Sequence, residues 1–278
     1  MQYSAYVPCF NNAATIRAAV EGIGSQTVPP AELLVVDDGS IDDSPARLRG
    51  LPVRIVRHDA NLGRGAARAR AMMETRHEFV LCCDATNVVA ADFAACALRW
   101  FDDPAIGAVF GRINQRERDN AVSRWRARHL FKIGVSRAEM PGAVDGGRFA
   151  TWGAMVRRSA LLAVGNYDAR LRQAEDADVG RRLDAAGWRV VYDTRLAVFS
   201  IAENSLGQVL ERYWRWNAGR DCRVTWTGYL KNIRYSLGVA GRDLVSGAPA
   251  VAAISLLCPH YCFWRSRHWM RRHAASDG

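Results

Sequence analysis

The sequence contains no pair of cysteines at the Cys-x-x-Cys spacing of zinc sites, and its seven cysteines are an odd number. These features argue against a structural zinc site and against a framework of disulfide bonds. Several cysteines lie inside apolar segments, where a reduced thiol behaves as a small core residue. We therefore expect a protein of a reducing compartment, the cytoplasm.

The start of the sequence lacks the basic residues and the long apolar block of a secretory signal, so we expect no export. Residues 244–264 contain no Asp, Glu, Lys or Arg over the length of a membrane span, but prolines, a glycine and a histidine interrupt them. We expect this region to contact a membrane surface rather than to cross it. The predicted location is the cytoplasm, peripheral at the inner face of the plasma membrane.

Acidic residues are also in short supply, since 28 Asp and Glu stand against 38 Lys and Arg and leave a net charge of +10. Such a charge indicates an anionic partner, whether nucleic acid, a phosphorylated substrate or a membrane surface. The 278 residues, 49% of them hydrophobic, are enough for one large α/β domain with or without an appendage.

Two apolar runs end in aspartates. Residues 33–40 read Leu-Leu-Val-Val-Asp-Asp-Gly-Ser, and residues 79–83 lead directly into Asp84. Uninterrupted apolar runs are typical of strands buried in a parallel sheet, and such sheets bind ligands beyond the carboxyl ends of their strands. We therefore expect Asp37, Asp38 and Asp84 at one binding edge, although the first pair alone could be a solvated turn.

The remaining pattern alternates strands with helices, which predicts a doubly wound α/β sheet. Glu175 and Asp176 stand at the start of one of the helices, where acidic residues also serve simply as caps. The predicted strands are residues 3–7, 33–36, 53–56, 79–83, 106–111, 189–192 and 197–200, with a short one around residues 155–156. The predicted helices are residues 13–24, 66–76, 92–102 and 179–186.

The sequence beyond residue 205 is predicted to be helical, and we divide the chain into a domain of residues 1–204 and an extension of residues 205–278. The extension holds five of the nine tryptophans and eleven Lys and Arg. This composition suits an interfacial helix on an anionic membrane, a nucleic-acid surface or helices packed on the first domain. We expect no nucleic acid, because no nucleic-acid-binding signature accompanies it. Residues 112–137 form a second basic segment. It is either a loop and helix over the site or a solvated helix face.

Five short motifs follow one another along the chain: residues 7–12 (Val-Pro-Cys-Phe-Asn-Asn), 36–40 (Val-Asp-Asp-Gly-Ser), 61–68 (with Asn-Leu-Gly and Ala-Arg), 84–86 (Asp-Ala-Thr) and 175–176 (Glu-Asp). Their order and spacing resemble those of family 2 glycosyltransferases of the GT-A fold. The resemblance implies a GT-A type doubly wound mixed sheet flanked by helices, to which we add the helical, basic C-terminal extension.

The resemblance further implies a pocket for a nucleotide-diphosphate sugar donor. In it, Pro8 and Phe10 flank the base, Asp38 accepts a hydrogen bond from it, and Asp37 supports the turn. Arg68 is implied to bind the diphosphate or to position the base. The full set implied for the donor is Pro8, Phe10, Asn11, Asp37, Asp38, Asn61, Arg68, Asp84 and Thr86.

The implied reaction is inverting: an acceptor hydroxyl attacks the anomeric carbon as the nucleoside diphosphate leaves. Asp176 matches the catalytic base that removes the hydroxyl proton. Glu175 is implied to orient Asp176 or to contact the acceptor. The acceptor class is a glycan or a lipid-linked glycan, in cell-envelope or exopolysaccharide synthesis.

One motif departs from the family pattern, because Thr86 stands where the family's Asp-x-Asp has its second aspartate. A hydroxyl is a poorer ligand for Mg²⁺ or Mn²⁺ than a carboxylate. Three readings remain: Asp84 binds ribose or a weakly held metal, arginines of residues 112–137 or of the extension replace the metal, or catalysis is lost. We favour an enzyme with weak metal dependence, the alternative being a catalytically impaired binding or partner protein.

Overall fold

The computed structural model describes residues 1–115, 120–130, 141–217 and 225–273. The chain forms two compact units, which are described separately. Unit 1 comprises Met1–Arg116 and Arg137–Ala202, and unit 2 comprises Glu117–Ser136 and Glu203–Gly278. Much of the predicted basic segment at 112–137 lies outside the described residues.

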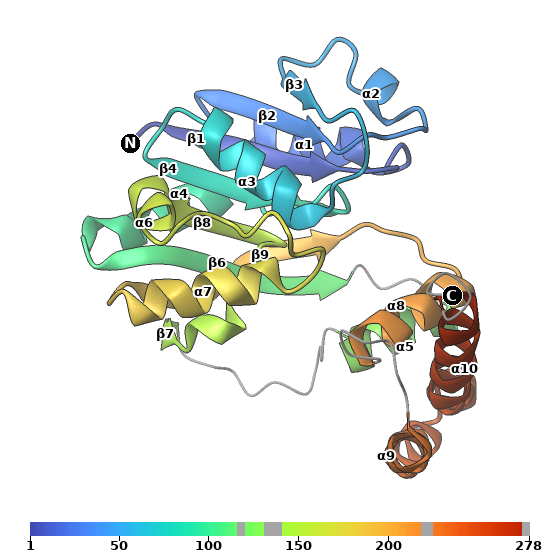
Figure 1. The fold of residues 1–278 in the computed structure, drawn as a ribbon. Coiled ribbons are helices and arrows are strands. Elements are labelled where there is room, and N and C mark those ends of the chain that lie inside the picture. Colours follow the sequence, from blue (N-terminus) through green and yellow to red (C-terminus); the bar gives the residue numbers. More distant parts are fainter. Residues whose placement is uncertain (116–119, 131–140, 218–224, 274–278) are drawn as a thin grey trace. The chain divides into compact units, whose positions relative to one another are not determined.

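A mixed sheet organises unit 1, with nine strands among the described residues in the order β3-β2-β1-β4-β8-β6-β9-β5 and with β7 paired to β9 (Figure 1). The first four strands in this order are parallel to one another, whereas β8 is antiparallel to both of its neighbours. The strands are β1 (Tyr3–Cys9), β2 (Glu32–Asp37), β3 (Arg54–Arg57), β4 (Phe79–Cys83), β5 (Asn87–Val89), β6 (Ile106–Gln115), β7 (Gly142–Val144), β8 (Gly153–Arg157) and β9 (Arg189–Ser200).

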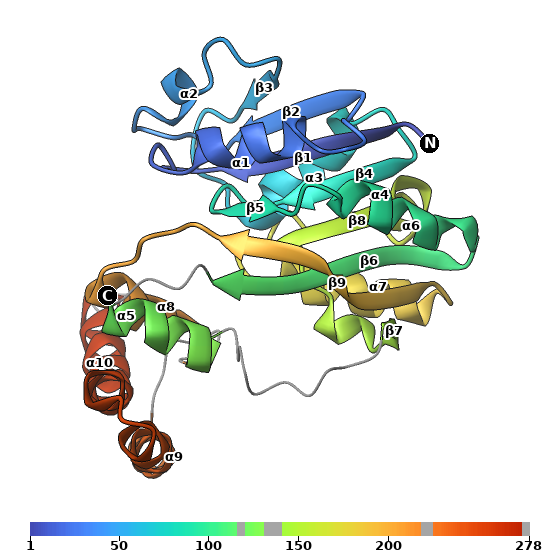
Figure 2. The same cartoon turned by 180° about the vertical axis from the view of Figure 1, so that it is seen from behind.

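Helices cover both faces of this sheet. On one face, α1 (Ile16–Gly24) and α4 (Phe93–Leu98) bury apolar side chains against β1, β2 and β4 (Figure 2). On the other, α3 (Arg64–Glu74), α6 (Arg158–Ala163) and α7 (Glu175–Ala185) pack their small and branched side chains (Figure 1). Short elements complete the unit: α2 (Ser44–Arg47) and the 3-10 turns Arg99–Asp102 and Gly146–Arg148. The predicted layered α/β architecture is confirmed.

The elements differ from the prediction mainly in the second half of the sheet. The two strands predicted at 189–192 and 197–200 are one strand, β9, which stays paired with β6 through a register shift. Polar residues Asp193, Thr194 and Arg195 look like a turn in the sequence, but they lie at that irregularity. The three-residue strands β5 and β7 are too short to show a pattern, and α1 begins at Ile16 rather than at residue 13.

Unit 2 is helical in its described residues, as predicted for the extension. It contains α5 (Ala121–Trp125), a π-helical turn at Arg126–Leu130, α8 (Leu206–Asn217), α9 (Trp226–Val245) and α10 (Pro249–His273). Trp125 is buried with side chains of α8 and α10, and its Nε1 donates to Ser255 Oγ at 2.9 Å. Within the described part of the chain, no helix combines the length and the apolar content needed to cross a bilayer.

Candidate functional site

Asp37 holds the turn that follows β2. Its Oδ1 accepts the backbone N–H of Ser40 at 3.0 Å, and Arg57 Nε lies 3.4 Å from Oδ2. The turn passes through Gly39 at a φ of +74°, where a Cβ atom would meet the backbone carbon of Ala60 at 2.6 Å. Only glycine fits this position, which is why Asp-Asp-Gly marks the end of the strand.

Asp38 is buried and receives four donors. Its Oδ1 accepts from the backbone N–H of Leu62 at 3.0 Å and contacts His58 Nδ1 at 2.8 Å. Its Oδ2 accepts from Asn61 Nδ2 at 3.0 Å and from the backbone N–H of Gly63 at 2.8 Å. Two carboxylate oxygens offer about four acceptor positions, so Asp38 fastens the end of β2 to residues 58–63.

The loop after β1 is tied to the same turn. Asn11, at a φ of +53°, donates its backbone N–H to Ser40 Oγ at 3.0 Å, and its Oδ1 accepts the backbone N–H of Ile41 at 3.0 Å. Phe10, just before it, is 41% exposed, whereas Pro8 is buried within β1. Of the two side chains expected to flank a base, Phe10 is the one that is exposed.

Arg68 joins the end of β4 to the start of α7. Its guanidinium is buried, with Nη2 2.7 Å from Asp84 Oδ1 and Nε 3.1 Å from Glu175 Oε1. Arg64 Nε lies 3.8 Å from the same Glu175 oxygen. Burial alone would lower the pKa of Arg68, but the charges of Asp84 and Glu175, with Tyr6, raise it well above its ordinary value. Arg68 is therefore a permanently charged link between two carboxylates that lie 91 positions apart in the chain, at 84 and 175.

Asp176 follows Glu175 in the first turn of α7, and its Oδ1 accepts the backbone N–H of Ala177 at 2.9 Å. Burial, and then repulsion by Glu175, raise its pKa, while Arg68 and Arg64 act in the opposite direction. A carboxyl with a raised pKa binds a proton more readily than an ordinary aspartate. Such a group can accept a proton from a hydroxyl that is losing it to a forming bond.

Asp84 is the carboxylate that the sequence predicts for a metal ion in this region. Among the described residues there is no group of three or more His, Cys, Asp and Glu placed to hold a metal. Asp84 is partly exposed but shares Oδ1 with Arg68, and Thr86 uses its backbone carbonyl to accept from Ile201. Mg²⁺ is commonly held by one or two carboxylates together with substrate phosphates and water. The residues thus fit a metal shared with a diphosphate, not one held by protein alone.

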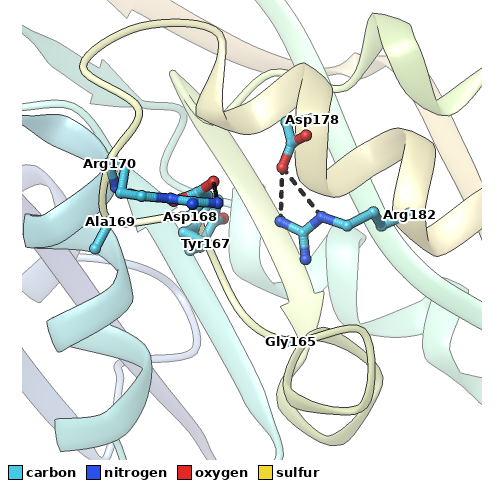
Figure 3. Close-up of a pocket in the computed structure, with 7 residues that line it drawn as sticks. All are labelled: Gly165, Tyr167, Asp168, Ala169, Arg170, Asp178 and Arg182. Carbon is cyan, nitrogen blue, oxygen red and sulfur yellow. Dashed lines mark hydrogen bonds and ion pairs between the residues drawn. The ribbon is translucent and has the colours of Figure 1, made fainter.

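A separate cavity of about 490 Å³ lies between the loop after α6 and the side of α7 (Figure 3). Its charged side chains form two internal pairs, Arg170 with Asp168 and Arg182 with Asp178, each at 2.8 Å (Figure 3). None of the predicted site residues lines it. Because its charges already neutralise each other, we do not regard it as the donor pocket.

Eight of the sequence-predicted residues thus fall into two groups, which leave out Pro8, Phe10 and Thr86. The first group holds the loops after β1, β2 and β3 together and consists of Asn11, Asp37, Asp38 and Asn61. In the second group, Arg68 connects Asp84 with Glu175 and its neighbour Asp176. The sequence analysis missed His58 and Arg172, whose Nη1 donates to Asn61 Oδ1 at 3.1 Å. His58 directly follows a strand and could have been found by the same strand-end rule, but Arg172 carries no local signal.

Comparisons with known proteins indicate the family of the chain. Residues 4–165 match the family described as Glycosyl transferase family 2. The chain is similar to an N-acetylglucosaminyltransferase of Bradyrhizobium diazoefficiens, 29% identical over 279 residues that cover 90% of this chain and 55% of that protein. It is also similar to the poly-beta-1,6-N-acetyl-D-glucosamine synthase of Staphylococcus epidermidis, 23% identical over 221 residues that cover 76% of this chain and 52% of that protein. The chain spans about half the length of these curated relatives.

Solved structures share the fold. A mannosyltransferase of Pyrobaculum calidifontis in complex with GDP-Man and Mn²⁺ matches with a TM-score of 0.61 at 20% identity, over 98% of this chain and 84% of that one. Staphylococcus aureus TarS 1-349 in complex with UDP-GlcNAc matches with a TM-score of 0.57 at 17% identity, over 87% of this chain and 73% of that one. The predicted GT-A fold class is confirmed.

Proposed function

Because the chain belongs to glycosyl transferase family 2, as its motifs predict, we propose that it is an inverting glycosyltransferase. It moves a sugar from a nucleotide-diphosphate donor to a glycan or lipid-linked acceptor in cell-envelope or exopolysaccharide synthesis. The observation that carries the proposal is the Asp84–Arg68–Glu175 bridge, because it ties the β4 end to the α7 turn that bears Asp176.

The proposed reaction forms one bond and breaks one bond at the anomeric carbon and moves one proton. The acceptor oxygen forms a bond to the anomeric carbon while its proton passes to the Asp176 carboxylate. The bond between the anomeric carbon and the diphosphate oxygen breaks, and the nucleoside diphosphate leaves with the electron pair. Attack opposite the leaving group inverts the anomeric centre. Glu175 and Arg68 act through the pKa of Asp176, which the charge of Glu175 raises and the charge of Arg68 lowers.

The donor subsite is proposed at the loops after β1, β2 and β3, with Phe10 against the base. In this arrangement Asp37, Asp38, Asn11 and Asn61 keep the loops in place through the hydrogen bonds described above. Asp84, with Thr86 beside it, is the residue that would hold a divalent metal shared with the diphosphate. Such an ion would neutralise the charge that gathers on the leaving group.

The identity of the donor is proposed from the relatives. One is named an N-acetylglucosaminyltransferase and another a poly-beta-1,6-N-acetyl-D-glucosamine synthase, so UDP-N-acetylglucosamine is the first donor to test. A lipid-linked acceptor and a place at the inner face of the plasma membrane are supported by the basic, tryptophan-rich extension. Such an acceptor lies in the membrane, and a positively charged unit attracts the enzyme to anionic lipid.

The test is hydrolysis of UDP-N-acetylglucosamine and GDP-mannose, with and without Mn²⁺, followed by transfer to a glycan acceptor. Asp176→Asn should lose turnover by at least about 100-fold, because general-base catalysis contributes on the order of 10²–10⁴. Asp178→Asn is the matched control, because Asp178 lies on the same helix and pairs with Arg182. Nucleotide binding by the wild type without any turnover on a suitable acceptor would support the binding-protein alternative instead.

A further inference from the structure

Helix α9 exposes a continuous apolar stripe. Trp226, Leu230, Leu237 and Leu244 are all exposed. At 100° per residue, these four positions fall within about 40° of one another around the helix axis. The buried residues of α9, which include Val239 and Ala240, lie on a different side of the helix. The stripe is thus a second apolar surface of α9, in addition to the one that makes its core contacts.

Helix α10 carries a shorter stripe beside the first. Leu257 and Trp264 are exposed and, seven residues apart, lie within about 20° of each other around the axis. Trp264 follows Phe263, whose ring packs against Trp226 with centroids 4.6 Å apart, so both stripes border the contact between the two helices. We call Trp226, Leu230, Leu237, Leu244, Leu257 and Trp264 the α9–α10 apolar face.

The charges around this face have one sign. Residues 226–273 contain seven Lys and Arg but a single acidic residue, Asp243. Asp243 is buried and already bound, by Arg128 Nη1 at 3.0 Å and His129 Nε2 at 2.8 Å. Arg234 is exposed on α9 and, at 100° per residue, lies about 80° from Trp226, at the border of the stripe. The described residues of α9 and α10 therefore present cations and no exposed carboxylate beside the apolar face.

We propose that the α9–α10 apolar face docks on an anionic lipid surface, with its Leu and Trp side chains in the acyl boundary and the flanking Arg side chains at the headgroups. A helix with an apolar stripe and basic flanks is suited to lie in a membrane interface. Nucleic acid would satisfy the cations, but its phosphate backbone offers nothing to cover four leucines. The inference deepens the membrane part of the proposed function by naming the contacting surface.

The experiment measures co-sedimentation of the full chain with vesicles of phosphatidylglycerol and phosphatidylcholine in equal parts, and with vesicles of phosphatidylcholine alone. We expect binding to the anionic vesicles that falls as salt rises, because salt screens the charges. Leu230→Gln/Leu237→Gln should weaken binding by at least about tenfold, because the variant loses the favourable free energy of moving two leucine side chains from water into the acyl boundary. Arg234→Gln should weaken it about fivefold, on the anionic vesicles only.

Tyr235→Gln is the matched control. Tyr235 is exposed on the same helix to a similar degree, 67% against 62% for Leu230, but at 100° per residue it lies about 180° from Trp226. The Tyr235→Gln variant should bind vesicles like the wild type, and circular dichroism should show that all variants fold. Absence of wild-type binding, or equal binding by the double variant, overturns the inference. So does a double variant that loses self-association while keeping vesicle binding, since the occupant is then a second copy. Donor hydrolysis in solution is measured separately and reports on the proposed transfer, so the two failures are distinguishable.

Discussion

Replacing Arg68 is the most direct perturbation of the candidate site. Its side chain and that of Glu175 are each 1% exposed, and the two groups are 3.1 Å apart. Arg68→Met leaves the Glu175 carboxylate buried beside only the more distant Arg64, and breaking a buried pair in this way costs about 3–5 kcal/mol. The second partner, Asp84, is 27% exposed, so its loss adds less than about 1 kcal/mol.

The assay is thermal unfolding followed by circular dichroism. In a domain of this size 1 kcal/mol shifts Tm by about 2–4 °C, so Arg68→Met should lower Tm by roughly 10 °C. Arg70→Met is the control: Arg70 lies on the same helix, is half exposed and pairs with Glu74 at i,i+4. Such a surface pair contributes about 0.3–0.5 kcal/mol. Adding Glu175→Gln to Arg68→Met should recover part of the loss, because the unpaired buried charge is then removed.

Two results would refute this reasoning. One is an Arg68→Met variant that is no less stable than Arg70→Met. The other is strict additivity of Arg68→Met and Glu175→Gln, because groups in contact should show a coupling energy of about 0.5–3 kcal/mol. Binding of UDP tests the role that the resemblance implies for Arg68. If the guanidinium contacts the diphosphate, Arg68→Lys should weaken UDP affinity strongly; if it links carboxylates, affinity should stay within about threefold.

Four further predictions follow from the same geometry. Because burial and Glu175 raise the pKa of Asp176, the rate should fall with decreasing pH at a higher pH than for an ordinary aspartate, and Glu175→Gln should move that fall to lower pH in a rate–pH profile. Asp38→Asn should lower stability in urea by about 1–3 kcal/mol, since its amide cannot accept from all four donors; unchanged stability with lost UDP binding would contradict this. Gly65→Ala should be destabilising by about 1–3 kcal/mol, because a Cβ there would lie 2.3 Å from the Asp168 carbonyl oxygen; a neutral effect in the same urea titration would argue against this packing. Thr86→Asp should strengthen Mn²⁺-dependent binding of UDP, measured by calorimetry, and no gain would argue against a metal at Asp84.

Much of the first half of the fold could be predicted from the sequence because β1, β2 and β4 are buried on both faces. The strand predicted at 79–83 matches β4 residue for residue, because an uninterrupted apolar run bounded by polar residues marks where the strand begins and ends. The second half contains an interrupted strand and two three-residue strands. Whether Asp193 and Arg195 form a turn or an irregularity in β9 depends on pairing with β6, and this information is not local.

The candidate site shows the same division. The position of Asp37, Asp38 and Asp84 at strand ends follows from the rule that parallel strands end at one edge, and the sequence contains that pattern. The partners of these residues do not follow from it. Arg68 reaches Glu175 across 107 positions, and Arg172 reaches Asn61 across 111. Such contacts depend on how α3, α7 and the loop between α6 and α7 pack, so the sequence indicates which residues matter but not which atoms they bind.

The charge around Asp84 offers a physical account of Thr86. Asp84, Glu175 and Asp176 carry three formal negative charges when ionised, and Arg68 and Arg64 supply two positive ones. A second aspartate at position 86 would add another negative charge where we propose that the donor diphosphate, itself an anion, binds. With a threonine there, Arg68 already offsets Asp84 at 2.7 Å, so less positive charge is needed from a metal to bring the donor in. A guanidinium this close also competes for Asp84 with any metal. Both effects favour weak dependence on a divalent ion. Both arise from Arg68, which the fold places against Asp84.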